Sequence, residues 1–371
     1  MPHAETPNTS IERYRRAIGW WLVGVAAMVF VMVIVGGLTR LTHSGLSMVE
    51  WRPLMGSVPP LTAPEWERIF EKYQEYPQFK LLNSDMTLQE FKGIFWFEYC
   101  HRLLGRVIGL AFFLPFVFFL FRRAFSKPMA AKMFLLFVLG GGQGVIGWWM
   151  VQSGMTERPD VSQYRLAIHL GAAFALYAAL VWVALGQFPS LLHQGEPTSE
   201  NSVWKPGGWL RTERFTRLLW LFAFVTILSG ALVAGLNAGF AFNTFPLMNG
   251  QLIPKGLYGL RPWPINHFEN HLTVQFQHRL MAGTLFMAIV VLWNHLRHAP
   301  VSIRTRQAAH AVFALACMQV LLGIATLLTV VWTPLASAHQ TMALLLFTAL
   351  TWLLRTLQQP IQTNGNVSAV G

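Results

Sequence analysis

FWFEYCHRLLGRVIGLAFFLPFVFFLF, residues 95–121, is long and apolar enough to cross a lipid bilayer as a single helix. A helix needs about 20 residues to span the hydrocarbon core. The stretch nevertheless begins with Glu98, His101 and Arg102, and ionisable side chains within a membrane are costly and usually have a function. The stretch therefore predicts a membrane-spanning helix with a functional polar group near one end.

The whole chain has the composition of a membrane protein. Of its 371 residues, 54% are hydrophobic and 12% are charged, and the mean hydropathy is +0.42. Soluble proteins carry about twice that share of charged residues. Several apolar runs are of bilayer length, and none alternates in polarity as the strands of a membrane barrel do. The composition predicts an all-α polytopic membrane protein.

Eight spans are predicted, and the charges of the loops orient them. The spans are 17–38, 94–121, 132–152, 165–187, 217–237, 273–293, 309–332 and 336–356. Arginine and lysine are concentrated before the first span and after each even-numbered span. All of these segments lie on the same side of the membrane as the N-terminus. Cytoplasmic loops are rich in these residues, so both termini are expected inside and the long loops 39–93 and 238–272 outside. This topology accounts for the net charge of +12, and no nucleic-acid partner is expected.

The N-terminal residues have neither the pattern of a cleaved signal peptide nor that of a transit peptide. This favours the plasma (inner) membrane of a bacterium. The polar segment 190–216 contains glycine and proline and indicates a cytoplasmic linker. It would join an N-terminal four-helix bundle, 1–189, to a C-terminal one, 217–371.

The two halves of the chain contain similar stretches in the same order. GGLTRLTHSGLSMVEWRPLMG at 36–56 is similar to GALVAGLNAGFAFNTFPLMNG at 230–250, FEYCHRLLG at 97–105 to VQFQHRLMA at 274–282, QGVIG at 143–147 to QVLLG at 319–323, and HLGAAFALYAALVW at 169–182 to HQTMALLLFTALTW at 339–352. An even number of spans in each half gives both copies the same orientation. The repeat predicts two parallel four-helix bundles side by side.

Four histidines occupy equivalent positions in this repeat. His101 and His278 lie on the second predicted helix of each half, and His169 and His339 on the fourth. At 1.5 Å per residue, each lies roughly 6–12 Å inside the outer end of its span. Imidazole is a common axial ligand of haem iron, and helical bundles hold cofactors between facing helices. The histidines predict one haem site in each half, while a buried histidine bonded to a carbonyl remains the alternative for each.

The charged neighbours of these histidines differ between the halves. Arg102 and Arg279 follow the histidines directly and could bind haem propionates or extend toward the headgroups. Glu98 precedes His101 by three residues and so shares its helix face, whereas Gln275 takes its place in the second half. A carboxylate can exchange protons or stabilise a cation. We predict chemistry in the first half and a permanent redox cofactor in the second, although Glu98 could instead pair with Arg102.

Other metal sites are less well supported by the sequence. Zinc needs three or four ligands at one point, and each half offers two intramembrane histidines. Cys100 and Cys317 form no recognisable thiolate or disulfide motif. HFENH at 267–271 lies in an outer loop and could bind a metal ion or simply begin a helix. In the other outer loop, EWERIFEKYQEYPQF predicts an amphipathic helix at the membrane surface.

The stretches GGLTRLTHSGLSMVEWRP, FEYCHRLLGR, RLAIHLGAA, FQHRLMAG and ASAHQ resemble the haem A synthase family, in its proteobacterial and mitochondrial branch. The resemblance implies oxidation of the C8 methyl group of haem O to a formyl group, as part of cytochrome oxidase biogenesis. It implies that His278 and His339 hold a haem b cofactor, and that His101 and His169 hold haem O beside the acidic Glu98. Another branch has two cysteines in the first outer loop. Loop 39–93 has none, so no thiol-based role is expected there.

Two other classes of protein would also hold haem between paired histidines. One is a diheme electron-transfer protein, and the other is a haem transporter or chaperone. A transmembrane electron carrier should place its haems near opposite faces, whereas both histidine pairs are expected near the outer face. A haem O synthase is an expected partner by pathway logic. The electron donor, the source of the formyl oxygen and a possible homo-oligomer are left open by the sequence.

Overall fold

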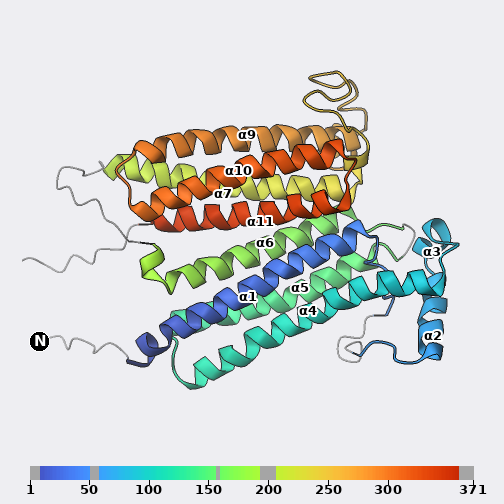
Figure 1. Cartoon of the computed structure of the whole chain (residues 1–371), viewed down its shortest axis with the longest axis horizontal. Helices are drawn as coiled ribbons and strands as arrows, with labels where there is room; N and C mark the ends of the chain where they lie inside the picture. Colours follow the sequence, from blue (N-terminus) through green and yellow to red (C-terminus); the bar gives the residue numbers. More distant parts are fainter. Residues whose placement is uncertain (1–8, 51–57, 156–158, 193–205, 359–371) are drawn as a thin grey trace, which may run out of the picture.

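The computed structural model describes residues 9–50, 58–155, 159–192 and 206–358, which form helices joined by loops (Figure 1). Eight of these helices are long and apolar enough to span a membrane: α1 (Thr9–Leu41), α4 (Leu88–Phe121), α5 (Lys127–Gln152), α6 (Gln163–Gly186), α7 (Pro206–Gly235), α9 (His271–His298), α10 (Ile303–Leu328) and α11 (Thr333–Thr356). The predicted all-α membrane protein with eight spans is thereby confirmed.

The shorter helices lie in the connections. They are α2 (Ala63–Gln74), α3 (Pro77–Leu82) and α8 (Asn266–Glu269), with the 3-10 turns η2 (Pro189–Leu191), η3 (Ala238–Phe240) and η4 (Trp263–Ile265). Loop 39–93 contains a helix as predicted, α2, but its apolar face turns to the protein and not to the membrane. Its buried Trp66 and Tyr73 pack on Phe91 and Phe95 of α4, so its apolar face contacts α4.

Several spans begin earlier than predicted, because polar capping residues start helices ahead of the apolar run. The Thr87 side chain accepts a hydrogen bond from the Glu90 N–H at 3.4 Å and begins α4 well before the predicted residue 94. Ser126 and Ser302 cap α5 and α10 in the same way.

Besides these earlier starts, two further predicted boundaries are wrong. Span 309–332 was placed too far along the chain, because α10 ends at Leu328 and the backbone at Val330 and Val331 is left-handed, with φ of 53° and 58°. Residues 206–216 of the predicted linker form the start of α7. A proline is well suited to a first helical turn, where its missing N–H has no partner to lose. Residues 193–205 of the linker lie outside the described residues.

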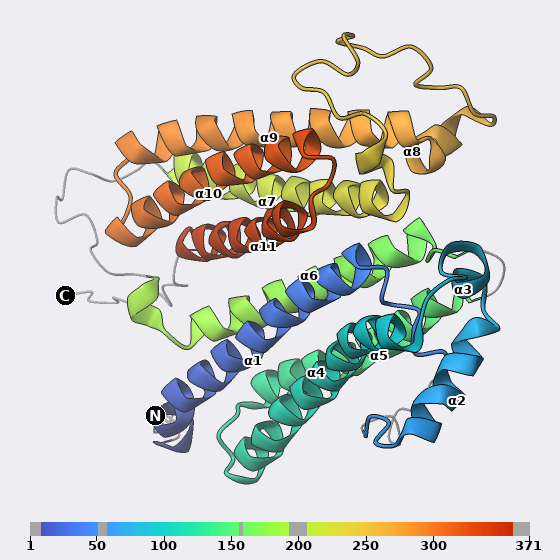
Figure 2. The same cartoon turned by 45° about the vertical axis from the view of Figure 1, so that its right-hand side comes forward.

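Each half of the chain contributes four long helices that contact one another in the same cyclic order. Helix α1 contacts α4 and α6, and α5 contacts the same two helices; likewise α7 contacts α9 and α11, and α10 contacts those two. The two sets lie side by side, with α6 against α7 and α11 against both α1 and α6 (Figures 1 and 2). This is the order of contacts that two copies in one orientation would produce.

Small residues let the two sets of helices approach closely. A Cβ on Gly235 of α7 would lie 2.7 Å from the Cα of Gln163 on α6, and one on Gly171 of α6 would lie 2.6 Å from Leu228. Farther along the helices, the rings of Phe174 on α6 and Phe347 on α11 have centroids 5.9 Å apart. Helices in lipid associate through such close packing, since apolar surface alone gives no preference for protein over lipid.

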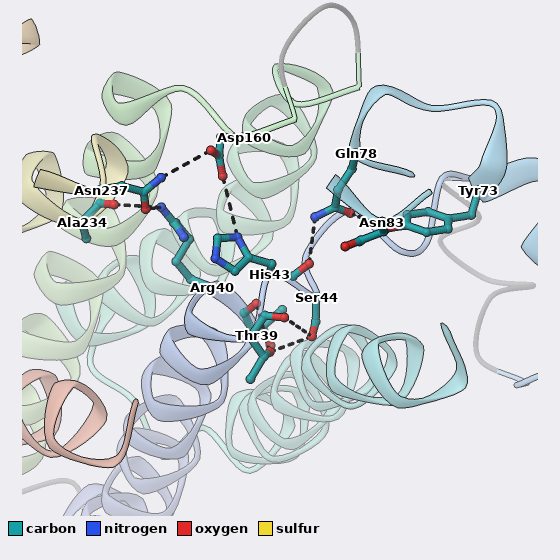
Figure 3. Close-up of polar contacts among 11 residues, drawn as sticks. Thr39, Arg40, His43, Ser44, Tyr73, Gln78, Asn83, Asp160, Ala234 and Asn237 are labelled. Carbon is teal, nitrogen blue, oxygen red and sulfur yellow. Dashed lines mark hydrogen bonds and ion pairs between the residues drawn. The ribbon is translucent and has the colours of Figure 1, made fainter. Parts of the chain in front are cut away.

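A polar network joins the two sets at the helix ends that the sequence predicts to lie outside, called here the outer ends (Figure 3). Arg40 of α1 donates hydrogen bonds to the Ala234 carbonyl and to Oδ1 of Asn237, both at 2.8 Å. Asn237 in turn donates to Asp160 of the first half at 3.4 Å. Bonds therefore cross between the halves in both directions.

His43 links this network to the outer helices. Its Nδ1 lies 3.9 Å from Asp160, and its carbonyl accepts a 2.8 Å hydrogen bond from Gln78 of α3. Burial and the nearby Arg40 lower the pKa of the His43 imidazole, and Asp160 partly opposes this shift. The ring is therefore mainly neutral at pH 7 and adds little charge to the network.

Replacing Gly235 with alanine should weaken the packing of α6 on α7. The new methyl group meets backbone atoms of Gln163, which cannot rotate away, and overpacking of this kind typically costs about 1–3 kcal/mol. Thermal unfolding in detergent should show a lower midpoint for Gly235→Ala. Gly109→Ala is the matched control, because a Cβ there has nothing within 4 Å. Equal midpoints for the two variants would contradict the packing role.

Candidate functional site

The four histidines singled out in the sequence form two pairs in the structure. His101 of α4 and His169 of α6 are electrostatic neighbours, as are His278 of α9 and His339 of α11. All four side chains are largely buried. His101 lies farther from the start of its helix than the others do, because α4 begins ahead of its predicted span. Each pair thus joins the second and fourth long helices of one half.

Every one of these rings lies against a glycine of another helix. The pairs, with the distance from an ideal Cβ on the glycine to the nearest ring atom, are Gly36 with His101 (3.4 Å), Gly147 with His169 (3.2 Å), Gly230 with His278 (3.0 Å) and Gly323 with His339 (2.9 Å). The glycines come from the first and third long helices and match in the repeat. The imidazoles therefore contact bare backbone, where a larger residue would push the ring away.

In the second half, a hydrogen bond with Ser229 determines which ring nitrogen of His278 carries a proton. The Ser229 hydroxyl donates to the Thr226 carbonyl at 2.7 Å, and its oxygen lies 2.8 Å from Nδ1 of His278. Because the single hydroxyl proton is already used, the oxygen must accept from the Nδ1–H. Nε2 is then unprotonated and able to bind a metal. Metal-binding histidines commonly donate their other ring N–H to such a partner.

Equivalent glutamines accompany His339 and His169. Gln319 of α10 lies 3.4 Å from one ring nitrogen of His339, and the second ring nitrogen is buried without a hydrogen-bond partner. In the first half, the amide nitrogen of Gln143 on α5 can donate to Nδ1 of His169 at 3.3 Å. A buried polar atom without a partner is rare in proteins, which makes this nitrogen of His339 a candidate ligand position.

The two arginines form the same clamp in both halves. Each donates through its two terminal nitrogens to carbonyls of the segment that follows the first long helix. Arg102 binds the carbonyls of Met48 (2.8 Å) and Glu50 (3.2 Å), and Arg279 binds those of Phe242 (2.7 Å) and Thr244 (2.8 Å). These carbonyls occupy matching positions in the repeat. Each guanidinium therefore holds the segment that follows the first long helix of its half, which we call the outer segment.

Glu98 is part of the clamp in the first half. One carboxylate oxygen accepts from the Ser47 hydroxyl at 2.8 Å and from the Met48 N–H at 2.7 Å, and the other lies 2.5 Å from Arg102. The side chain is almost fully buried. The pairing with Arg102 that the sequence left open as an alternative is therefore present.

Gln275 replaces the carboxylate with a neutral amide that keeps the contact with the arginine but makes a different contact with the outer segment. Its oxygen accepts from Arg279 at 3.3 Å, and its nitrogen donates to the Ala238 carbonyl at 3.1 Å. Among the ion pairs of the described residues, none involves Arg279, whose buried Nε also lacks a partner. The second site thus holds a positive charge that the first site neutralises.

The residues of the HFENH stretch turn to separate partners. Nδ1 of His267 lies 3.0 Å from Gln277, and Glu269 accepts a 2.9 Å hydrogen bond from Tyr164 of α6. The part of the chain that the structure describes contains no cluster of three or more histidine, cysteine, aspartate or glutamate side chains arranged to hold a metal ion. The stretch acts as a helix start, with α9 beginning at His271.

The prediction from the sequence did not identify the glycines and glutamines that contact the imidazole rings. They were present in the repeated stretches, where Gly36 matches Gly230 and Gln143 matches Gln319. That match was the available signal. It could not be interpreted because a ring-to-glycine contact depends on which helices are neighbours.

Comparison with known proteins identifies the family. The model of the COX15-CtaA family, described as cytochrome oxidase assembly protein, matches residues 19–351. The chain belongs to this family. It is 51% identical to the "Heme A synthase" of Nitrosospira multiformis over 91% of this chain and 92% of the relative. It is 47% identical to that of Nitrosomonas eutropha, over 95% and 97%, and 48% identical to that of Parvibaculum lavamentivorans, over 91% and 93%.

Removing the Glu98 carboxylate should release the outer segment of the first half. Glu98→Ala leaves the partly buried Arg102 without its partner, and such a loss typically costs about 3–5 kcal/mol. Limited proteolysis within residues 39–93 should become faster. Glu98→Gln should remain resistant, because a neutral amide can still accept a hydrogen bond from the arginine, as Gln275 does from Arg279 in the second half. Unchanged cleavage in Glu98→Ala would contradict this role.

Proposed function

We propose that this membrane protein is a haem A synthase, an oxidoreductase that converts haem O into haem A. The observation that carries the proposal is the pair of neighbouring imidazoles in each half, from helices that match in the repeat. The names of the relatives at about half identity support it. The finer reaction proposed is oxidation of the C8 methyl group of the porphyrin to a formyl group.

The second half is proposed to hold haem b between His278 and His339. Three features of the described residues fit an iron porphyrin there: the unprotonated Nε2 of His278, the unpartnered ring nitrogen of His339, and the glycine backbone behind both rings. Arg279 has no acidic partner among the described residues and is proposed to attract a propionate. When bound, haem b would relay electrons.

The first half is proposed to hold haem O between His101 and His169. Gly36 and Gly147 lie against these rings, and the Glu98–Arg102 clamp holds the outer segment. Glu98 lies one helical turn from His101 and is proposed to accept a proton or stabilise positive charge on the substrate. Arg102 also remains a proposed propionate partner.

This assignment divides the chain into a substrate-binding bundle, 1–189, a cytoplasmic linker, 190–216, and a cofactor-binding bundle, 217–371. The proposed location is the bacterial inner membrane with both termini in the cytoplasm, because the basic loops lie on that side. A haem O synthase is the proposed partner, since its product is the substrate here.

The identity of the extracted haems tests the function. The protein is purified from cells that supply haem O, and its porphyrins are separated by chromatography and identified by mass. Haem B together with haem A or a hydroxylated intermediate is expected, with or without unreacted haem O. Haem B alone at two per chain, despite available haem O, would instead indicate an electron-transfer protein. Haem O released unaltered would indicate a carrier.

Single substitutions should remove haem from one half at a time. Gly323→Ala and Gly230→Ala bring a methyl group within about 3 Å of the His339 and His278 rings, respectively. Both substitutions should lower the haem B content, as His339→Ala should. Gly283→Ala on α9 is the control, since a Cβ there meets nothing within 4 Å. Haem content and the electron paramagnetic resonance signal of bis-histidine iron measure the effect. Normal haem B in both glycine variants would contradict the proposed site.

Glu98→Gln separates binding from chemistry in the first half. The amide keeps the clamp but carries no charge, so haem O should still bind while the yield of haem A falls strongly. Gln275→Glu is the matched variant in the second half and should not raise that yield. The proposal for Glu98 fails if Glu98→Gln produces haem A at the normal level.

A further inference from the structure

The outer segment between η3 and η4 exposes an unusual number of apolar side chains. We call residues 244–263 the apolar loop. Leu252 and Ile253 at its far end are 78% and 68% exposed. Further exposed side chains in the loop are Phe245, Leu247, Tyr258, Leu260 and Trp263. A contiguous apolar surface of this kind usually marks a contact with a membrane or a partner.

The loop is built to present these side chains. Met248 and Gln251 exchange backbone hydrogen bonds of 2.9 and 3.1 Å, and the Thr244 hydroxyl donates to the Leu247 carbonyl at 2.7 Å. At the other end, the Asn266 side chain bonds both backbone groups of Leu260, each at 3.0 Å. The apolar side chains are therefore exposed on an internally bonded framework.

The loop lies beside the bundle, at the level where the helices end. Both views show it rising sideways from the outer end of α9, across the helix axes (Figures 1 and 2). A bilayer that surrounds the eight spans would have its outer headgroup layer at this level. The loop thus occupies the place of the outer leaflet next to α9.

The charges of the loop suit a lipid surface. Lys255 and Arg261 are exposed, and the sequence contains no acidic residue between Glu213 and Glu269. Tyrosine and tryptophan favour the boundary between headgroups and acyl chains, and basic side chains favour anionic headgroups. The outer helix α2 of the first half is instead rich in exposed glutamates. The loop of the second half thus combines exposed apolar side chains with positive charge.

We propose that the apolar loop inserts Leu252 and Ile253 into the outer leaflet of the membrane, with Lys255 and Arg261 at the phosphates. Thr244 begins the loop, and its carbonyl is bound by Arg279 of the second site. Lipid insertion therefore anchors the segment that closes this site. Insertion of the loop does not depend on which reaction the protein performs.

Fluorescent labels at single cysteines test the insertion in the full-length protein. In a background with Cys100→Ser and Cys317→Ser, Ile253→Cys and the control Ser84→Cys are labelled with an environment-sensitive dye. The protein is placed in nanodiscs of phosphatidylcholine and phosphatidylglycerol. The label at 253 should emit at shorter wavelength, be quenched by spin-labelled lipid and be protected from iodide. The label at 84, exposed in the other outer loop, should show the reverse.

A charge reversal tests the headgroup contact separately. Lys255→Glu combined with Arg261→Glu should shift the emission at 253 toward that of a water-exposed label in anionic nanodiscs. Lys80→Glu, an exposed lysine of α3, is the control and should leave the emission unchanged. A label at 253 that iodide quenches freely would overturn the proposal. A label shielded from both iodide and lipid would also overturn it, because that result indicates contact with protein.

Discussion

A glycine on one helix gives an imidazole on the next helix room to lie against bare backbone, and this contact recurs at all four histidines. The first and third long helices of each half supply the glycines, while the second and fourth supply the rings. Each histidine pair therefore depends on the spacing of all four helices. A change in that spacing by the width of one methyl group would displace a ring, because interiors packed at this density have no spare volume.

The arginine clamp adds a polar constraint to this packing. Arg102 and Arg279 hold matching carbonyls at the outer ends of the two sites, so the segment after the first helix closes each site in the same way. What differs is charge. Glu98 compensates Arg102, whereas Gln275 leaves Arg279 positive. The two candidate sites thus share the arginine clamp but differ in electrostatics, in keeping with the proposed reacting substrate in one and the proposed retained cofactor in the other.

The outer connections differ more than the helices do. In the first half, α2 and α3 pack on an extension of α4, and the Arg40–Asn237 network ties this region to the second half. In the second half, the corresponding segment extends sideways with its apolar residues exposed. The repeat is therefore preserved where rings and carbonyls must be positioned, and it diverges where the chain meets water or lipid.

The number of spans, the four histidines and their repeat could be read from the sequence, because apolar length and residue identity are local properties. The helix ends were less predictable, since caps such as Thr87 extend helices beyond the apolar run and Val330 ends one within it. Only the tertiary structure decided that Glu98 pairs with Arg102 and Ser47, and that Gly323 backs His339. Those contacts join segments far apart in the chain, and the pattern of single helices carries no information about which faces meet.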